Sequence, residues 1–85
     1  MNNNTIKIDA AEIEIAIQLL NKYVDNAAIK PVILVLEALK KAPENEALIV
    51  ELADALNSIG PTQGAVLTYA PYVSALISHG LFGDD

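Results

Sequence analysis

The sequence contains no cysteine, no tryptophan and no arginine, and its 85 residues include a single histidine. Without cysteine there is no disulfide framework and no thiolate chemistry, and His79 alone cannot build a zinc site of the Cys/His type. Five lysines stand against eleven acidic residues, so the formal net charge is −6. Nucleic acids and anionic membrane surfaces require clustered basic residues, and we therefore expect neither as a partner.

The N-terminal residues also lack the apolar stretch of a secretion signal, which predicts a location in the cytoplasm of the producing cell. Residues 1–8 form a polar leader that we predict to be disordered, followed by a single helical domain over residues 9–83. The chain is 53% hydrophobic, enough for one modest core. No pattern of cofactor or metal ligands is present, so we expect neither kind of site.

Charge is absent from residues 57–83, which contain no Asp, Glu, Lys or Arg. Helices that only pack on a soluble core usually keep charges on their outer faces, so we infer that part of this surface contacts protein. Three of the four aromatic residues lie here, which favours a homodimer through Tyr69, Tyr72, Val73, Leu76 and Phe82. Alternatively, residues 65–82 span a membrane, as in a small lysis-type protein, although Pro71 and several polar residues oppose this.

Long apolar runs are also scarce, and the main one lies in residues 31–39, where five aliphatic residues stand in succession. Periodicity alone does not distinguish a helix from a strand here. Pro31 suits a first helical turn, or else residues 27–30 form that turn, and the lysines at 40 and 41 suit the negative end of a helix. The run therefore predicts a helix that is apolar nearly all round, buried nearly all round and central to the fold.

An earlier helix is predicted over residues 10–24. Asp9 is its expected N-cap, Glu12 is placed to complete a capping box, and Ile8 with Ile13 has the spacing of a hydrophobic staple. A later helix begins after Pro43 and ends at Gly60, which can adopt left-handed geometry.

Further helical segments follow over residues 61–69 and 71–79, kinked or split at Pro71 and ending at Gly80. The fold class is thus all-α: a small bundle of four helices, the fourth kinked or split at Pro71, around the buried central helix.

Two resemblances arise in the second half. From Pro43 onward the sequence resembles a tetratricopeptide helical hairpin, although no second copy is visible and the pattern breaks at Pro71. The residues that carry this resemblance are Leu52, Ala53, Leu56, Gly60, Ala65 and Tyr69. We take the resemblance to imply only an antiparallel helix pair. Ser58 resembles the phosphopantetheine-bearing serine of acyl carrier proteins. However, Asn57 replaces the usual aspartate and the following acidic helix is missing.

The acidic residues fit solvated helical faces better than an acid/base pair, because none is set among apolar neighbours. We therefore expect no enzymatic activity. Glu51 and Asp54 point outward on their helix and are the predicted binding face for a basic protein. The predicted function is that of a small acidic interaction module, of the inhibitor, immunity, antitoxin, anti-defence or adaptor kind. The alternatives are an acidic carrier domain, marked by phosphopantetheine on Ser58, and the membrane-associated protein above.

Overall fold

The computed structural model describes the backbone of residues 8–82 and the side chains of residues 8–78. This part of the chain is all-helical and contains no strand, which confirms the predicted fold class at that level. Its elements are α1 (Ala10–Tyr23), α2 (Asn26–Lys41), α3 (Ala47–Ser58), the short 3-10 helix η1 (Gly60–Thr62), α4 (Gln63–Tyr69) and α5 (Pro71–Phe82). The leader predicted to be disordered falls, for residues 1–7, outside the described residues.

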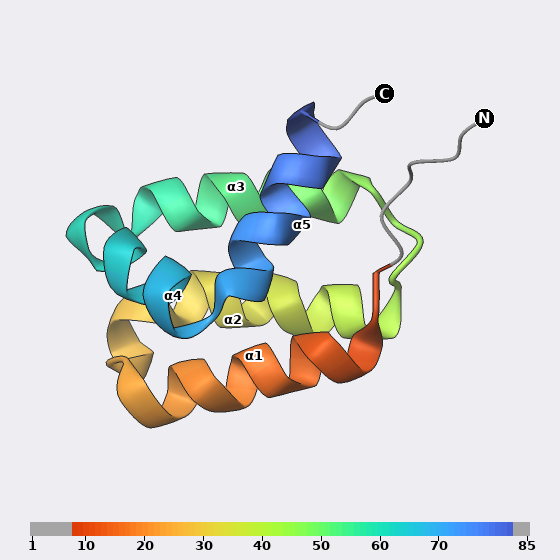
Figure 1. Ribbon diagram of the computed structural model, residues 1–85. Coiled ribbons are helices and arrows are strands. Elements are labelled where there is room, and N and C mark those ends of the chain that lie inside the picture. The colour runs from red at the N-terminus through yellow and green to blue at the C-terminus, as the bar shows by residue number, and fades with distance from the viewer. Residues whose placement is uncertain (1–7, 83–85) are drawn as a thin grey trace.

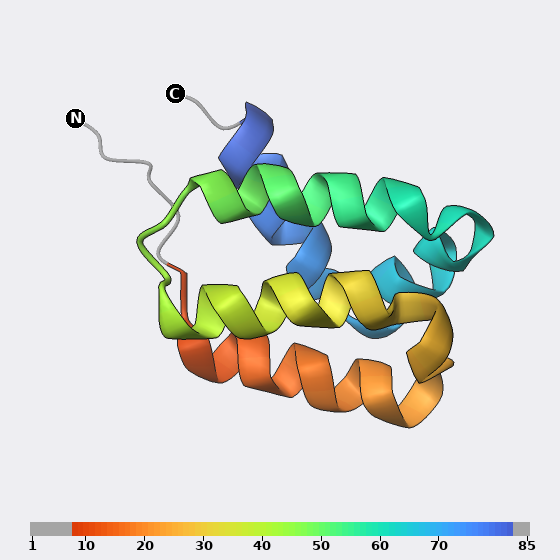
Figure 2. The same cartoon turned by 180° about the vertical axis from the view of Figure 1, so that it is seen from behind.

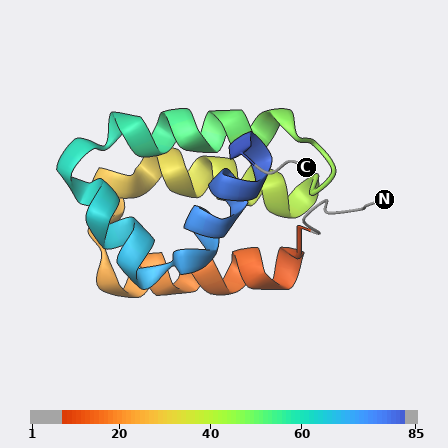
Figure 3. The same ribbon diagram turned by 45° about the horizontal axis from the view of Figure 1, so that its top comes forward.

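The first three helices form one layer, in which α2 lies between α1 and α3 (Figure 1). The C-terminal helices lie across one side of this layer, where α5 packs against α3, α4 and α1 (Figure 3). The view from behind shows α1, α2 and α3 without a covering helix (Figure 2). The core therefore lies between the three-helix layer and the C-terminal pair.

Apolar side chains from all five α-helices and from the break between the last two meet in this core, and no buried polar residue lies among residues 8–78. Regular helical spacing places them on one face of each long helix, as an amphipathic helix requires. The sixteen buried residues are Ile13, Ala16, Ile17, Leu20, Ile29, Val32, Leu36, Leu39, Ile49, Leu52, Ala55, Leu56, Val66, Ala70, Val73 and Leu76.

The aliphatic run in α2 is buried on one side only, so the prediction of nearly all-round burial is not confirmed. Val32 and Leu36 are 0% exposed, whereas Leu34 is 61% exposed. Leu34 is two residues beyond Val32, about 200° around the helix, so it faces away from the core that Val32 enters. With α4 and α5 on one side of the layer, nothing within the described chain covers the other.

The start of α2 also differs from the prediction for Pro31. The helix begins at Asn26, because the Oδ1 atom of Asp25 accepts a hydrogen bond from the Ala27 N–H at 3.1 Å. Pro31 is therefore inside the helix rather than in its first turn. The alternative prediction, that residues 27–30 belong to the first turn of this helix, is confirmed.

The N-terminus of α1 is capped by Asp9, whose Oδ1 atom accepts from the Ala11 N–H at 2.8 Å, as predicted. The capping box with Glu12 is not formed. The backbone N–H of Asp9, which that box would satisfy, instead donates to the Tyr72 hydroxyl at 2.9 Å. A residue from the first turn of α5 thus completes the cap of α1.

The break predicted at Pro71 is a complete split into two helices. Ala70 leaves helical geometry with φ −132° and ψ 71°, and Pro71 then begins α5, where its missing N–H costs nothing. Gly60 has φ +57°, the left-handed geometry predicted for the end of α3. The predicted end at Gly80 is wrong, because α5 continues to Phe82. Glycine within a helix costs only about 1 kcal/mol, which neighbouring turns can offset.

The antiparallel pair suggested by the tetratricopeptide resemblance is not present as expected. Such a pair would join α3 to the next helix, but α3 packs mainly against α2 and α5. The reason lies in the chain between them. Gly60 and Pro61 lead into η1, and the seven-residue α4 ends before it can run back along α3. The resemblance therefore does not extend to the packing.

Candidate protein-binding surfaces

The five residues predicted for self-association do not form one exposed surface. Val73 and Leu76 are 0% exposed, because α5 uses this side to enter its own core. Tyr72 is half-buried against that core, and its hydroxyl accepts a hydrogen bond from the Asp9 N–H. Only Tyr69 is clearly exposed, and the side chain of Phe82 lies outside the described residues. A Tyr72→Asp variant would therefore disturb the fold and not only a surface.

The outer side of α5 explains part of the missing charge. Among residues 71–78, where its side chains are described, the exposed ones are Pro71, Ser74 and Ser78, which recur at helical spacing. Serine hydroxyls keep such a surface hydrated without formal charge. Two features thus account for the absence of charge from residues 71–78, namely burial of the inner face and serine on the outer one. Neither feature requires a partner.

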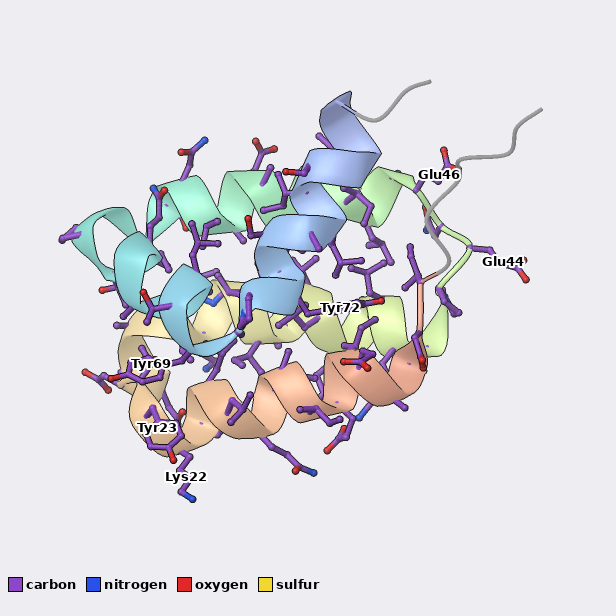
Figure 4. All side chains as sticks on the ribbon, in the orientation of Figure 1. Lys22, Tyr23, Glu44, Glu46, Tyr69 and Tyr72 are labelled. Atoms are coloured by element: carbon purple, nitrogen blue, oxygen red, sulfur yellow. The ribbon has the colours of Figure 1, made fainter. Side chains whose placement is uncertain are left out.

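An aromatic pair that the sequence did not predict lies where α1 and α4 meet. The rings of Tyr23 and Tyr69 are stacked, with centroids 5.0 Å apart and planes inclined by 14°. The Lys22 Nζ atom is 5.3 Å from the Tyr23 ring centroid, and Figure 4 shows the three side chains in succession at one edge of the molecule. Tyr23 is 52% and Tyr69 42% exposed. No local pattern marks this pair, since it joins residues far apart in the chain.

The outward face of α3 gathers acidic side chains. Glu51 and Asp54 are exposed, as predicted, and Val50 between these positions and the helix start is 49% exposed. Glu46 precedes the helix, and its side chain makes no capping bond. Asn45 takes that task, since its Oδ1 atom accepts from the Ala47 N–H at 3.1 Å. We call Glu46, Val50, Glu51 and Asp54 the α3 face.

Basic side chains lie elsewhere in the described part of the chain. Its four lysines are on α1 and α2, and none occurs between residues 42 and 82. Only Lys40 forms ion pairs within residues 8–78: one with Glu14 of α1, and one with Glu37 at 3.3 Å. The acids of the α3 face therefore have no basic partner within the described chain.

The ion pair between Lys40 and Glu14 connects α1 to α2, and the contacts of Lys40 shift two pKa values. Hydrogen bonds from Lys40 and then from Gln18 lower the pKa of the Glu14 carboxyl below its usual value. The same bond to Glu14, followed by that to Glu37, raises the pKa of Lys40. Both side chains are partly exposed, so these contacts act at the surface of the layer.

Ser58, the residue compared with a carrier-protein serine, has a structural contact. The Ser58 hydroxyl donates to the Ala55 carbonyl at 2.7 Å in the last turn of α3. No group of three potential metal ligands gathers within the part of the chain that the structure describes. His79 belongs to the residues whose side chains are not described.

The segment considered as a membrane span, residues 65–82, is divided between α4 and α5. Within residues 8–82, no helix combines the length and the apolar composition needed to cross a membrane.

Comparison of the chain with family models, with curated proteins and with solved structures finds no match.

Proposed function

We propose that this protein acts by binding another protein, and that the α3 face is the surface it uses. One observation carries the proposal. Three exposed acids surround the half-exposed Val50, and no lysine of the described chain pairs with any of them. Between residues 44 and 54 the chain has four acids and no base, which makes this its most acidic stretch.

A surface of this kind suits a basic partner. Unpaired carboxylates attract positive charge over several ångströms, which steers encounters and raises the association rate. Val50 supplies an apolar contact at the centre, where binding interfaces exclude water. The function that follows is that of an acidic inhibitor, immunity protein, antitoxin, anti-defence protein or adaptor. We propose no catalytic step, no cofactor and no nucleic-acid partner for it, and we place it in the cytoplasm of the producing cell.

Charge reversal tests the proposal once a partner has been captured with the tagged full chain and identified by mass spectrometry. Glu51→Lys and Asp54→Lys should each slow association and weaken its dependence on salt, because each removes an attraction that salt screens. Glu12→Lys is the matched control, since it makes the same change of net charge at an exposed position of α1. Surface plasmon resonance at several salt concentrations supplies the rates.

The control separates a local effect from a general one. Equal slowing by Glu12→Lys would show that net charge alone attracts the partner, and the α3 face would lose its role. Association rates that respond to none of the three variants would remove the proposal altogether.

A further inference from the structure

The stacked pair of Tyr23 and Tyr69 is the largest exposed aromatic feature among residues 8–78. Scattered exposed apolar residues are ordinary on a protein surface. Two half-exposed tyrosines that stack on each other form a preorganised surface for binding another protein. The stack restricts both rings before any partner arrives, so little further rotamer freedom is lost on binding. A tyrosine ring can also be buried while its hydroxyl remains at the wet rim.

The charged residues nearest to Tyr23 in the sequence are one cation and one anion. Lys22 and Asp25 lie on either side of Tyr23 in the chain, and both are exposed. The neighbouring η1 and α4 carry no charge at all, and their exposed residues include Pro61, Gly64 and Thr68. We call Lys22, Tyr23, Asp25 and Tyr69 the tyrosine face. In a chain of net charge −6, it is a surface on which like charges do not accumulate.

We infer that the tyrosine face binds a second copy of this chain. In a two-fold dimer the same surface meets itself, so a face with one cation and one anion can place Lys22 of each copy near Asp25 of the other. An acidic chain repels its own copies elsewhere, most of all through the α3 face. The tyrosine face avoids that repulsion and supplies aromatic area for the contact.

This interface goes beyond the binding of a foreign protein, because it uses a different part of the molecule. The tyrosine face lies at the junction of α1 and α4, whereas the α3 face lies on the helix at the far side of α2 (Figure 4). A dimer formed in this way would present both α3 faces. Two such faces could bind a partner with two basic sites more tightly than one, through the higher effective concentration of the second face.

Sedimentation equilibrium of the full chain tests this inference over concentrations from about 10 µM to about 1 mM. The wild type should pass from monomer to dimer within this range. Tyr23→Asp should raise the dissociation constant at least about tenfold, because it removes a ring and adds a charge to the contact. Leu34→Asp is the matched control: it also replaces an exposed apolar residue with an acid, but on the uncovered side of α2. It should dimerise nearly as well as the wild type.

A second measurement needs no variant and remains decisive if Tyr23→Asp fails to fold. Amide chemical shifts of the wild type, followed by NMR over the same concentrations, should change mainly at residues 22–26 and 61–71. A wild type that stays monomeric at the highest concentration would overturn the inference. Shifts that change on another surface, or a Leu34→Asp variant as impaired as Tyr23→Asp, would also overturn it.

Discussion

The three-helix layer and the C-terminal segment both bury aliphatic side chains in one core, but they carry different residues on their outer sides. Helices α1, α2 and α3 bury aliphatic stripes and carry charges on their outer sides, including the ion pairs of Lys40. The segment from Ile59 to Ser78 buries Val66, Ala70, Val73 and Leu76 equally well, but its outer side has serine, threonine and tyrosine in place of charged residues. The comparison shows that missing charge is not in itself evidence of an interface. The half-exposed side chains of the same segment must be located before an interface is inferred.

The largest expected effect tests whether the two regions share one core. Leu36 of α2 and Leu76 of α5 are both 0% exposed, so Leu36→Ala and Leu76→Ala should each cost about 2–5 kcal/mol of the free energy of unfolding. Leu34→Ala, in the same helix as Leu36 but 61% exposed, should change it by less than about 0.5 kcal/mol. Urea unfolding followed by circular dichroism gives all three values. A mild effect of Leu76→Ala alone would mean that the C-terminal segment is not part of the core.

A smaller effect is expected at the hydrogen bond that joins the regions. Tyr72→Phe removes the hydroxyl that accepts from the Asp9 N–H, and it should lower the free energy of unfolding by about 1 kcal/mol. Tyr69→Phe is the matched control, because no hydrogen bond of its hydroxyl occurs within the described residues. Thermal unfolding of both variants measures the difference. If the two variants are equally stable, the cap of α1 does not depend on α5.

The smallest effect concerns the ion pair between Glu14 and Lys40. The folded state lowers the pKa of Glu14, so the stabilisation is complete above the unfolded pKa of this group and is lost as pH falls through the folded value. The raised pKa of Lys40 has the opposite consequence, and its stabilisation is lost as pH rises through the folded value. The difference in unfolding temperature between wild type and Glu14→Gln should therefore be greatest around neutral pH and should shrink in acid. If the difference in unfolding temperature is the same at every pH, the substitution acts through something other than the charge of Glu14.

Local features of the sequence predicted much of the fold. Asp9 and Gly60 marked helix ends through their own backbone preferences, and Pro71 marked the break before α5. What the sequence could not show was which side of an apolar helix would be covered. Leu34 has the same character as Leu36, and only the placement of α4 and α5 on one side of the layer distinguishes them. The run of aliphatic residues therefore predicts more burial than the structure has.

The candidate surfaces divide in the same way. The exposure of Glu51 and Asp54 followed from helical spacing alone, since both lie opposite the stripe of Leu52 and Leu56. The tyrosine face did not, because the stack joins α1 to α4 and no periodicity links Tyr23 to Tyr69. The Tyr72 hydroxyl likewise reaches a cap at the other end of the chain. Contacts between segments that are distant in the chain could not be predicted from the sequence.

Photo-crosslinking in the producing cell identifies the surface that a partner touches, and so tests whether the α3 face binds a basic protein. A photoreactive amino acid would replace Val50 on the α3 face, and in a second variant Leu34 on the uncovered side of α2; both positions are exposed and apolar. We expect the Val50 variant to crosslink to a basic protein of the cell and the Leu34 variant to form no such crosslink. Crosslinks of the same protein to both positions, or to Leu34 alone, would contradict the assignment of binding to the α3 face.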